Sequence, residues 1–497
     1  MKIGQMLASF ALSTLAAAAL AVSFEPPADA ADHEKSASVV SVDACPPSFP
    51  ANWRCLRIAV PEDYSVPSGK RTDVRVVVAP AQRPKPKPEA IVLIQGGPGV
   101  SGTVVAEAGF LPSIGALQAT HDLVVVDERR VSGPEALTCP PSGPADEAAT
   151  WAEDLFSFAH LQSCLERSAV RTNLKSFSTS NFARDVESVR AALHYDSVEF
   201  YSTNYGSLIV QEYIRRFPER VRAAVLADAA PMDEPVSWSS DRWTVRAIRA
   251  TLAGCRADAE CRRAYPRIDN EFNALMASTA VAGLKVTIQA PGGPQSLVFD
   301  RDTLLAFFRA HFHFMRDVAD IPFEIHELSS ADPVRVAAIG QEILGYQHAA
   351  FGGVALGVWM SVECAEEAPA MRARLSRGER PGSGRVAAML AACRTWPHGE
   401  PPPDFHQAVR SDVPLLLLAS PMEPGYPAEL APRVAAGFSH VRVVLDANHG
   451  HVFDDDWSMC LGPQAVAFLD SLDLKAVDSR CAARFRFRPF KLPRSGE

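Results

Sequence analysis

Residues 198–217 read VEFYSTNYGSLIVQEYIRRF, and this stretch decides the fold. Residues 198–201 form a short run that favours a β-strand, and the apolar side chains of residues 207–217 have helical spacing. The helix is expected to end before Pro218, which cannot continue it without losing a hydrogen bond. Between the two lies a tight turn with Asn204 at its centre, a small residue two positions before it and a glycine two positions after it. The stretch therefore predicts a strand, a sharp turn and a helix, the repeating unit of an α/β protein.

Short apolar runs of the same kind lie on both sides of this unit. We predict strands at 91–94, 123–126, 198–201, 223–226, 415–418 and 441–445. These runs are continuous and rich in Val, Ile and Leu, as expected for strands that are buried on both faces of a parallel sheet. Two earlier runs, 56–60 and 74–78, are predicted to pair with each other around the turn at Ser68 and Gly69. The sequence therefore predicts an α/β fold.

The strand–helix alternation stops after Pro231 and resumes near Pro414. The intervening segment is predicted to be mainly helical, with clear helical spacing at 242–253, 302–316 and 334–346. A helical insertion between two strands of such a sheet is expected to cover the carboxyl-terminal edge of the sheet, where these folds place their ligands. We therefore expect a core made of residues 31–231 and 412–497, with an inserted helical cap at 232–411.

The N-terminus predicts export. Lys2 precedes an apolar run over residues 6–24, and an Ala-x-Ala pattern follows at 28–30, as in a secretory signal peptide cleaved near Ala30. An uncleaved membrane anchor is the alternative. No later run of about 18 apolar residues exists, so no membrane contact is expected after cleavage. The net charge of -9 argues against a nucleic-acid partner. The chain is expected in a periplasm or outside the cell.

All ten cysteines follow the predicted signal peptide, and an even number in an exported protein indicates disulfides. Pairing of successive cysteines would close short loops. Those pairs would be Cys45 with Cys55, Cys139 with Cys164, Cys255 with Cys261, Cys364 with Cys393, and Cys460 with Cys481. The sequence alone leaves the connectivity open. It contains no Cys-x-x-Cys pair, so a structural zinc site is not expected.

Three further patterns follow predicted strands and carry chemical groups. The strand at 91–94 leads into QGGPG at 95–99, where glycines allow backbone N–H groups to approach a substrate carbonyl. After 415–418 comes Glu423, and after the last strand come His449 and His451. A nucleophile position, an acid and a histidine in this order are typical of an α/β-hydrolase.

The sequence resembles the proline iminopeptidase and tripeptidyl aminopeptidase group of α/β-hydrolases over nearly all of the mature chain. The most specific stretch is 183–231. Other matching segments are GGPG at 96–99, DER at 127–129, CAEE at 364–367, GH at 450–451, and the two closing cysteines, Cys460 and Cys481. The resemblance implies an α/β-hydrolase fold with a helical cap, a peptide or other small molecule as substrate or ligand, and no cofactor or metal.

The resemblance also implies roles for individual residues. The N–H groups of Gly97 and Tyr205 would form the oxyanion hole. His451 would be the general base, although His449 is an alternative, and Glu423 would orient it. Glu366 in the cap would hold the free amino group of a substrate by charge. Glu366 could equally be a helix-capping or salt-bridge residue.

The departures from the family pattern concern the chemistry itself. Asn204 stands where the family has its nucleophilic serine. Ser202 and Arg130 each replace a usual glycine, Glu423 stands where aspartate is commoner, and Gln95 stands where histidine is frequent. An asparagine amide cannot be activated by a neighbouring histidine as a hydroxyl can. Asparagine does tolerate the positive φ of such a turn, so the turn can persist without its chemistry.

Three functions remain open from the sequence. In the first, the protein is an exported, catalytically impaired relative of serine aminopeptidases that binds peptides or small ligands. In the second, it is an active peptidase or esterase that uses Ser202, Thr203 or Ser207, or water activated by His451. In the third, Asn204 is an engineered or erroneous replacement of serine in an otherwise intact enzyme. The acidic run after His451 is expected to be a solvated loop and not a metal site.

Overall fold

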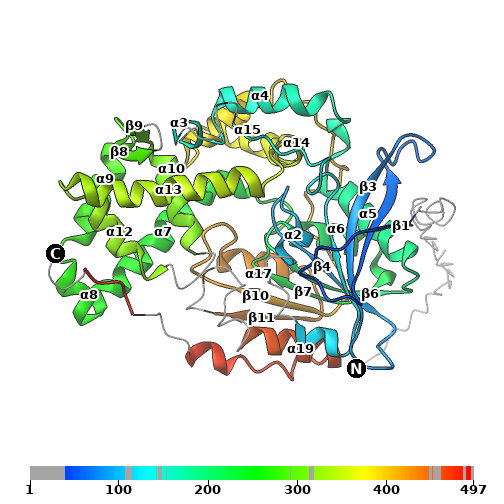
Figure 1. Cartoon of the computed structure of the whole chain (residues 1–497). Helices are drawn as coiled ribbons and strands as arrows, with labels where there is room; N and C mark the ends of the chain where they lie inside the picture. Colours follow the sequence, from blue (N-terminus) through cyan, green and yellow to red (C-terminus); the bar gives the residue numbers. More distant parts are fainter. Residues whose placement is uncertain are drawn as a thin grey trace, which may run out of the picture. The chain divides into compact units, whose positions relative to one another are not determined.

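The computed structural model places a mostly parallel sheet at the centre of the chain (Figure 1). The residues that it describes are 40–106, 115–141, 143, 148–152, 154–290, 293–312, 318–446, 450, 460–484 and 489–493. They belong to the unit Ala37–Glu497; the predicted signal peptide and its cleavage site lie outside the described residues.

Nine strands of the described chain form the sheet, in the order β1-β2-β3-β5-β4-β6-β7-β10-β11. Their bounds are β1 Val40–Asp43, β2 Arg54–Pro61, β3 Arg71–Ala79, β4 Ala90–Ile94, β5 Leu123–Val126, β6 Val198–Thr203, β7 Val221–Ala227, β10 Leu415–Ala419 and β11 Val441–Leu445. The pairs from β5 through to β11 are parallel, and β1, β2 and β3 extend the sheet in antiparallel pairing. This topology is the α/β-hydrolase fold, which confirms the predicted fold class.

Alternating side chains of each central strand enter two different apolar cores. In β4, Val92 and Ile94 belong to one core, whereas Ile91 and Leu93 belong to the other. The first core also contains side chains of α5 (Thr179–Ala192) and α6 (Gly206–Arg216), and the second contains those of α19 (Leu461–Ser471). The sheet is therefore covered on both faces, which explains why its strands are continuous apolar runs.

The segment between β7 and β10 is mainly helical, as predicted. Its elements are α7 Val236–Ala257, α8 Ala259–Ala264, α9 Ile268–Thr279, β8 Leu284–Ala290, β9 Gly293–Phe299, α10 Arg301–His311, α12 Ile321–Leu328, α13 Pro333–Gly353, α14 Leu356–Glu366, α15 Ala368–Ser376 and α16 Gly384–Ala392. The part from α7 to α13 has its own apolar core, whereas α14 and α16 contribute to a core of the sheet. The hairpin of β8 and β9 and the edge strand β1 were not predicted.

Shorter elements connect these parts. They are α2 Gly102–Val105, α3 Ala148–Trp151, α4 Phe158–Ala169, α17 Ala431–Ala435 and the 3-10 turns Gly115–Ala119, Leu174–Ser176, Pro218–Arg220, Ala428–Leu430 and Ser479–Arg484. Among the described residues, no helix combines the length and the apolar character needed to cross a bilayer.

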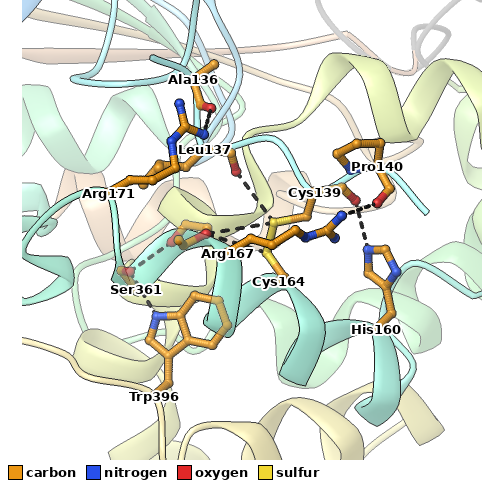
Figure 2. The surroundings of a disulfide bond; sticks show 12 residues. Ala136, Leu137, Cys139, Pro140, His160, Cys164, Arg167, Arg171, Ser361 and Trp396 are labelled. Atoms are coloured by element: carbon orange, nitrogen blue, oxygen red, sulfur yellow. Dashed lines mark hydrogen bonds between the residues drawn. A yellow bond between two sulfur atoms is a disulfide. The ribbon is translucent and has the colours of Figure 1, made fainter. Parts of the chain in front are cut away.

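All ten cysteines lie within the described residues. They form five disulfides, each between two successive cysteines, as in the pairing considered from the sequence. Figure 2 shows one of these disulfides, Cys139–Cys164, which ties the segment after β5 to α4. Nearby, the Trp396 indole donates to the Ser361 hydroxyl at 2.9 Å, so this disulfide lies where α4 meets α14 and the segment after α16. The structure thereby resolves the connectivity that the sequence left open.

Candidate active site

The turn between β6 and α6 has the backbone of a nucleophile elbow. Asn204 lies at its apex with φ of 45° and is only 4% exposed. Its N–H donates to the Ala227 carbonyl at 3.0 Å, and its carbonyl accepts from the Ser207 N–H at 2.9 Å. A Cβ on Gly206 would lie 2.7 Å from the Ile94 carbonyl oxygen, so strand and helix approach too closely for any side chain there. The chain therefore keeps the strained turn with asparagine in the left-handed position, which this residue tolerates.

The glycine loop after β4 packs directly against this turn. A Cβ on Gly96 would lie 2.9 Å from the Asn204 Cβ, which explains why position 96 has no side chain. The loop continues through Gly97 to Gly99, whose N–H donates to the Glu128 carboxyl at 3.1 Å. The N–H groups of Gly97 and Tyr205 donate to no other group in the described part of the chain. The two expected oxyanion-hole donors are therefore available for a ligand.

The side chains around the apex are closely packed. The Asn204 amide nitrogen is buried and has no hydrogen-bond acceptor among the described residues. The three hydroxyls considered as substitutes, on Ser202, Thr203 and Ser207, are also buried without a described partner, and each residue is less exposed than Asn204. None of these hydroxyls is therefore more accessible than position 204.

Glu423 lies after β10 at the same end of the sheet. At this end, hydrogen bonds join the neighbouring strands: the Asp228 N–H donates to the Leu418 carbonyl, and the Asp446 N–H donates to the Ala419 carbonyl. The Glu423 side chain is buried, and one of its oxygens accepts from the N–H groups of Gly425 at 2.8 Å and Tyr426 at 3.2 Å. The turn therefore fixes this carboxyl in place.

His449 and His451 lie outside the described residues, so their geometry stays a prediction. The described Gly450 between them packs against the end of α10, where a Cβ would lie 2.2 Å from the Phe312 carbonyl oxygen. Only glycine fits this contact, which joins the segment of the predicted base to the inserted helices.

A narrow acidic pocket lies beside the turn. It is lined by Pro98, Tyr205, Leu208, Met232, Asp233, Glu234, Pro235, Val362, Glu363, Glu366, Glu367, Ala370, Phe405, His406 and Tyr426. The glycine loop, the residue after Asn204 and the helices α14 and α15 thus all contribute. The pocket has a volume of ≈ 20 Å³, enough for about one water molecule.

Glu366, the predicted amine ligand, borders this pocket and also caps a helix. Its two carboxyl oxygens accept from the Thr179 N–H at 2.7 Å and the Thr179 hydroxyl at 2.6 Å, at the start of α5. The same hydroxyl lies 2.8 Å from the Tyr205 hydroxyl. Burial raises the pKa of the Glu366 carboxyl to about 8, although the hydrogen bonds from Thr179 oppose this. The capping role left open by the sequence is therefore present, next to the pocket.

Two more glutamates of this pocket were not predicted as site residues. The Glu367 oxygens accept from the N–H groups of Val236 and Ser237, both at 3.0 Å, at the start of α7. Burial raises the pKa of Glu367 to about 7, and burial and the adjacent Glu367 hold the pKa of Glu363 well above its usual range. Glu366 and Glu367 follow Glu363 by three and four residues, and this spacing was the available signal, because it places both beside Glu363 on the helix surface.

The DER segment at 127–129 stabilises the framework of the fold. Asp127 accepts hydrogen bonds from Ser101, Thr103 and Ser132. The Arg129 guanidinium is fully buried and donates to both oxygens of Asp185 in α5, at 2.9 and 2.6 Å. These contacts hold the segment after β5 against α5, the helix that begins with Thr179.

Comparisons with known proteins found similar sequences over parts of the chain. Residues 382–481 match the family described as TAP-like protein, a segment that contains Glu423 and His451. The chain is 30% identical over 203 residues to the serine protease Hip1 of Mycobacterium tuberculosis, a match that spans 38% of each chain. It is 24% identical over 473 residues to the tripeptidyl aminopeptidase of Streptomyces coelicolor, covering 89% of this chain and 85% of that one.

Among solved structures, proline iminopeptidase of Mycobacterium smegmatis aligns with a TM-score of 0.39 and 12% identity, over 84% of this chain and 99% of that one. Together with the topology described above, the sequence relatives support a peptidase-like α/β-hydrolase.

Proposed function

We propose that this chain is an exported peptidase-like α/β-hydrolase that binds the amino-terminal end of peptides and has little or no acyl-enzyme activity. The observation that carries the proposal is Asn204 at the left-handed apex of the elbow. This is the position from which a serine would attack, and an amide nitrogen there has no lone pair available for attack. Loss of a triad nucleophile leaves only a residual acceleration of roughly 10³–10⁴ over water.

The acidic pocket supports an amino group as the recognised feature. Glu363, Glu366 and Glu367 border a small space beside Pro98 and Tyr205. A protonated amine entering this space would favour ionisation of the buried carboxyls, whose pKa values burial has raised. The similarity to a tripeptidyl aminopeptidase supports the same ligand class. We therefore propose that residues 232–411 cover the pocket and supply the groups that select for a free amino terminus.

Export is the second part of the proposal. The predicted signal peptide of residues 1–30 and the five disulfides support it, because disulfides persist in oxidising compartments. Mass spectrometry of the purified protein would test it by giving the first residue. A mature N-terminus near Ala31 is expected, and a protein that starts at Met1 and stays reduced in the cytosol would contradict export.

The catalytic part is tested with the exported chain and three variants: Asn204→Ser, Asn204→Ala, and the double variant Asn204→Ser with His451→Ala. Each is assayed with aminoacyl and tripeptidyl coumarin substrates and with a serine-directed phosphonate probe. The unmodified chain and Asn204→Ala should be neither active nor labelled. Asn204→Ser should gain labelling and turnover, and the double variant should lose both.

Each other outcome has a definite meaning. Turnover and labelling by the unmodified chain would overturn the proposal in favour of a relocated hydroxyl. Turnover without labelling that disappears in a His451→Ala variant would instead support attack by water. If a folded Asn204→Ser variant stays silent, the assignment of Glu423 and His451 as its partners is wrong.

Binding is measured separately by calorimetry, with a tripeptide amide and its N-acetylated form. Saturable binding of the free amine and at least about tenfold weaker binding of the acetylated peptide are expected, because acetylation removes the charge. Equal affinity of the two peptides would rule out amine recognition while leaving the catalytic result untouched.

A further inference from the structure

A second cavity opens on the antiparallel side of the sheet, and its walls are rich in arginine. Four guanidinium groups contribute to it: Arg57 from β2, Arg71 and Arg75 from β3, and Arg130 from the segment after β5. Its volume is ≈ 240 Å³, far larger than that of the acidic pocket. The space can therefore hold a molecule of several non-hydrogen atoms.

Part of this positive charge has no partner within the protein. Arg57 pairs with Asp43 at 3.0 Å, and one nitrogen of Arg130 pairs with Glu135 at 2.8 Å. Arg75, by contrast, forms no side-chain hydrogen bond or ion pair with any other residue that the structure describes. Its Nε and the Nε of Arg130 are both buried without a described acceptor. A buried donor without an acceptor is costly, so both Nε–H groups are available to an acceptor that enters the cavity.

The backbone at Arg130 adopts an unusual conformation. Its φ is 59°, in the left-handed region. This conformation costs a residue with a Cβ about 1–2 kcal/mol, whereas glycine adopts it without strain. Here the chain instead carries an arginine whose side chain faces the cavity.

The acidic residues of the cavity do not neutralise it. Asp73 and Glu135 are exposed at its rim, whereas Glu128 is buried in its wall. One Glu128 oxygen accepts from the Gly99 N–H, and the other is buried without a described partner. Burial raises the pKa of the Glu128 carboxyl well above its usual range.

We propose that this cavity binds a small oxyanion of the phosphate class, either inorganic phosphate or a phosphomonoester. Arg75 and Arg130 each supply an Nε–H donor without a described acceptor, and Arg57 and Arg71 add positive charge. Guanidinium groups match the planar, paired oxygens of such an anion. The volume leaves room for an organic group beyond one phosphate. The site is separate from the acidic pocket and does not depend on the proposed peptidase-like function.

Calorimetry of the purified chain at constant ionic strength tests the site with three probes: inorganic phosphate, phenyl phosphate and tricarballylate, in a chloride background. Saturable binding of phosphate is expected, and tighter binding of phenyl phosphate would identify a phosphomonoester as the better occupant. The variants Arg75→Gln and Arg130→Gly should each weaken binding by about tenfold. Arg130→Gly also relieves the left-handed strain, so loss of binding in this variant cannot be ascribed to unfolding.

The matched control is Arg480→Gln, which removes an exposed arginine that pairs with Asp478 outside the cavity. Its phosphate affinity should equal that of the unmodified chain. The proposal is overturned if phosphate gives no saturable signal, if all three variants weaken binding equally, or if only the tricarboxylate binds.

Discussion

At the scale of single residues, Asn204 separates the geometry of an active site from its chemistry. The elbow needs a residue that accepts a φ of 45° between a strand and a helix in close contact, and asparagine meets this need. Catalysis needs an activatable nucleophile, which asparagine lacks. The sequence could predict both facts, because both depend on residue type and local pattern. It could not predict that Ser202, Thr203 and Ser207 are more buried than Asn204, because that depends on packing from other strands.

The contact between Gly96 and Asn204 gives a prediction at this scale. Gly96→Ala would place a Cβ 2.9 Å from the Asn204 Cβ, so the glycine loop must shift. We expect a loss of stability of about 1–3 kcal/mol, as for other overpacked sites, and loss of phosphonate labelling in the Asn204→Ser background. Urea unfolding and labelling measure the two effects.

Gly345 provides the control, because it lies within α13 and an added Cβ there meets nothing within 4 Å. Gly345→Ala should be neutral or stabilise by up to about 1 kcal/mol and leave labelling unchanged. Equal stability of the two alanine variants would show that the glycine loop does not press on position 204.

At the scale of elements, two adjacent glutamates where α14 meets α15 cap other helices, and Glu366 thereby connects the inserted segment to the core. Glu366 caps α5, and Glu367 caps α7, in both cases through backbone N–H groups. A carboxylate near a helix N-terminus is favourable, but burial opposes its ionisation. The sequence could predict the helices and the spacing of the glutamates. It could not predict the caps, since Thr179 and Glu366 are 187 residues apart.

The raised pKa of Glu366 predicts how stability depends on pH. Its pKa is about 8 in the folded chain, against an ordinary value of 4.5. The folded state therefore binds more protons between these values, and stability falls as the pH rises from about 5 to 8. Glu366→Gln keeps an acceptor for Thr179 without this titration. The fall in Tm between pH 5.5 and 8.5 should thus be smaller in Glu366→Gln, by on the order of 2 °C.

Glu379→Gln is the control for this titration, because Glu379 is exposed and its carboxyl pairs with no described residue besides Arg377. Its Tm should follow the unmodified chain at every pH. An unchanged pH profile for Glu366→Gln would show that this carboxyl ionises normally.

The disulfides give a second prediction for elements. Cys364–Cys393 joins α14 to the end of α16 across 29 residues, whereas Cys255–Cys261 closes only 6. Loop-closure entropy predicts a loss of about 3.5 kcal/mol when the first is replaced by two serines and of about 2 kcal/mol for the second. Denaturant unfolding of the two double-serine variants measures this difference. The reverse order would indicate that native packing, and not loop length, determines the effect.

At the scale of the whole molecule, the sequence predicted the strands of the central sheet except the edge strand β1. Buried strands such as β4 and β10 are uninterrupted apolar runs, which local reading detects. The edge strand β1 is short and largely exposed, so its residues carry no burial pattern. The sequence pattern did not predict the hairpin of β8 and β9, because the helical periodicity of the surrounding segments dominates that part of the chain.

The acidic pocket belongs to the whole molecule, because Tyr205, Glu366 and Tyr426 reach it from the first part of the core, the insertion and the second part of the core. A ligand bound there contacts all three and should stabilise them together. At a concentration of 100 times its Kd, a tripeptide amide should add about 2.7 kcal/mol to the free energy of unfolding. Calorimetric scanning should show every unfolding transition shifted upward with this peptide and none with its N-acetylated form at the same concentration. A shift confined to one of two transitions would mean that the peptide contacts only one part, and the pocket would then not be the binding site.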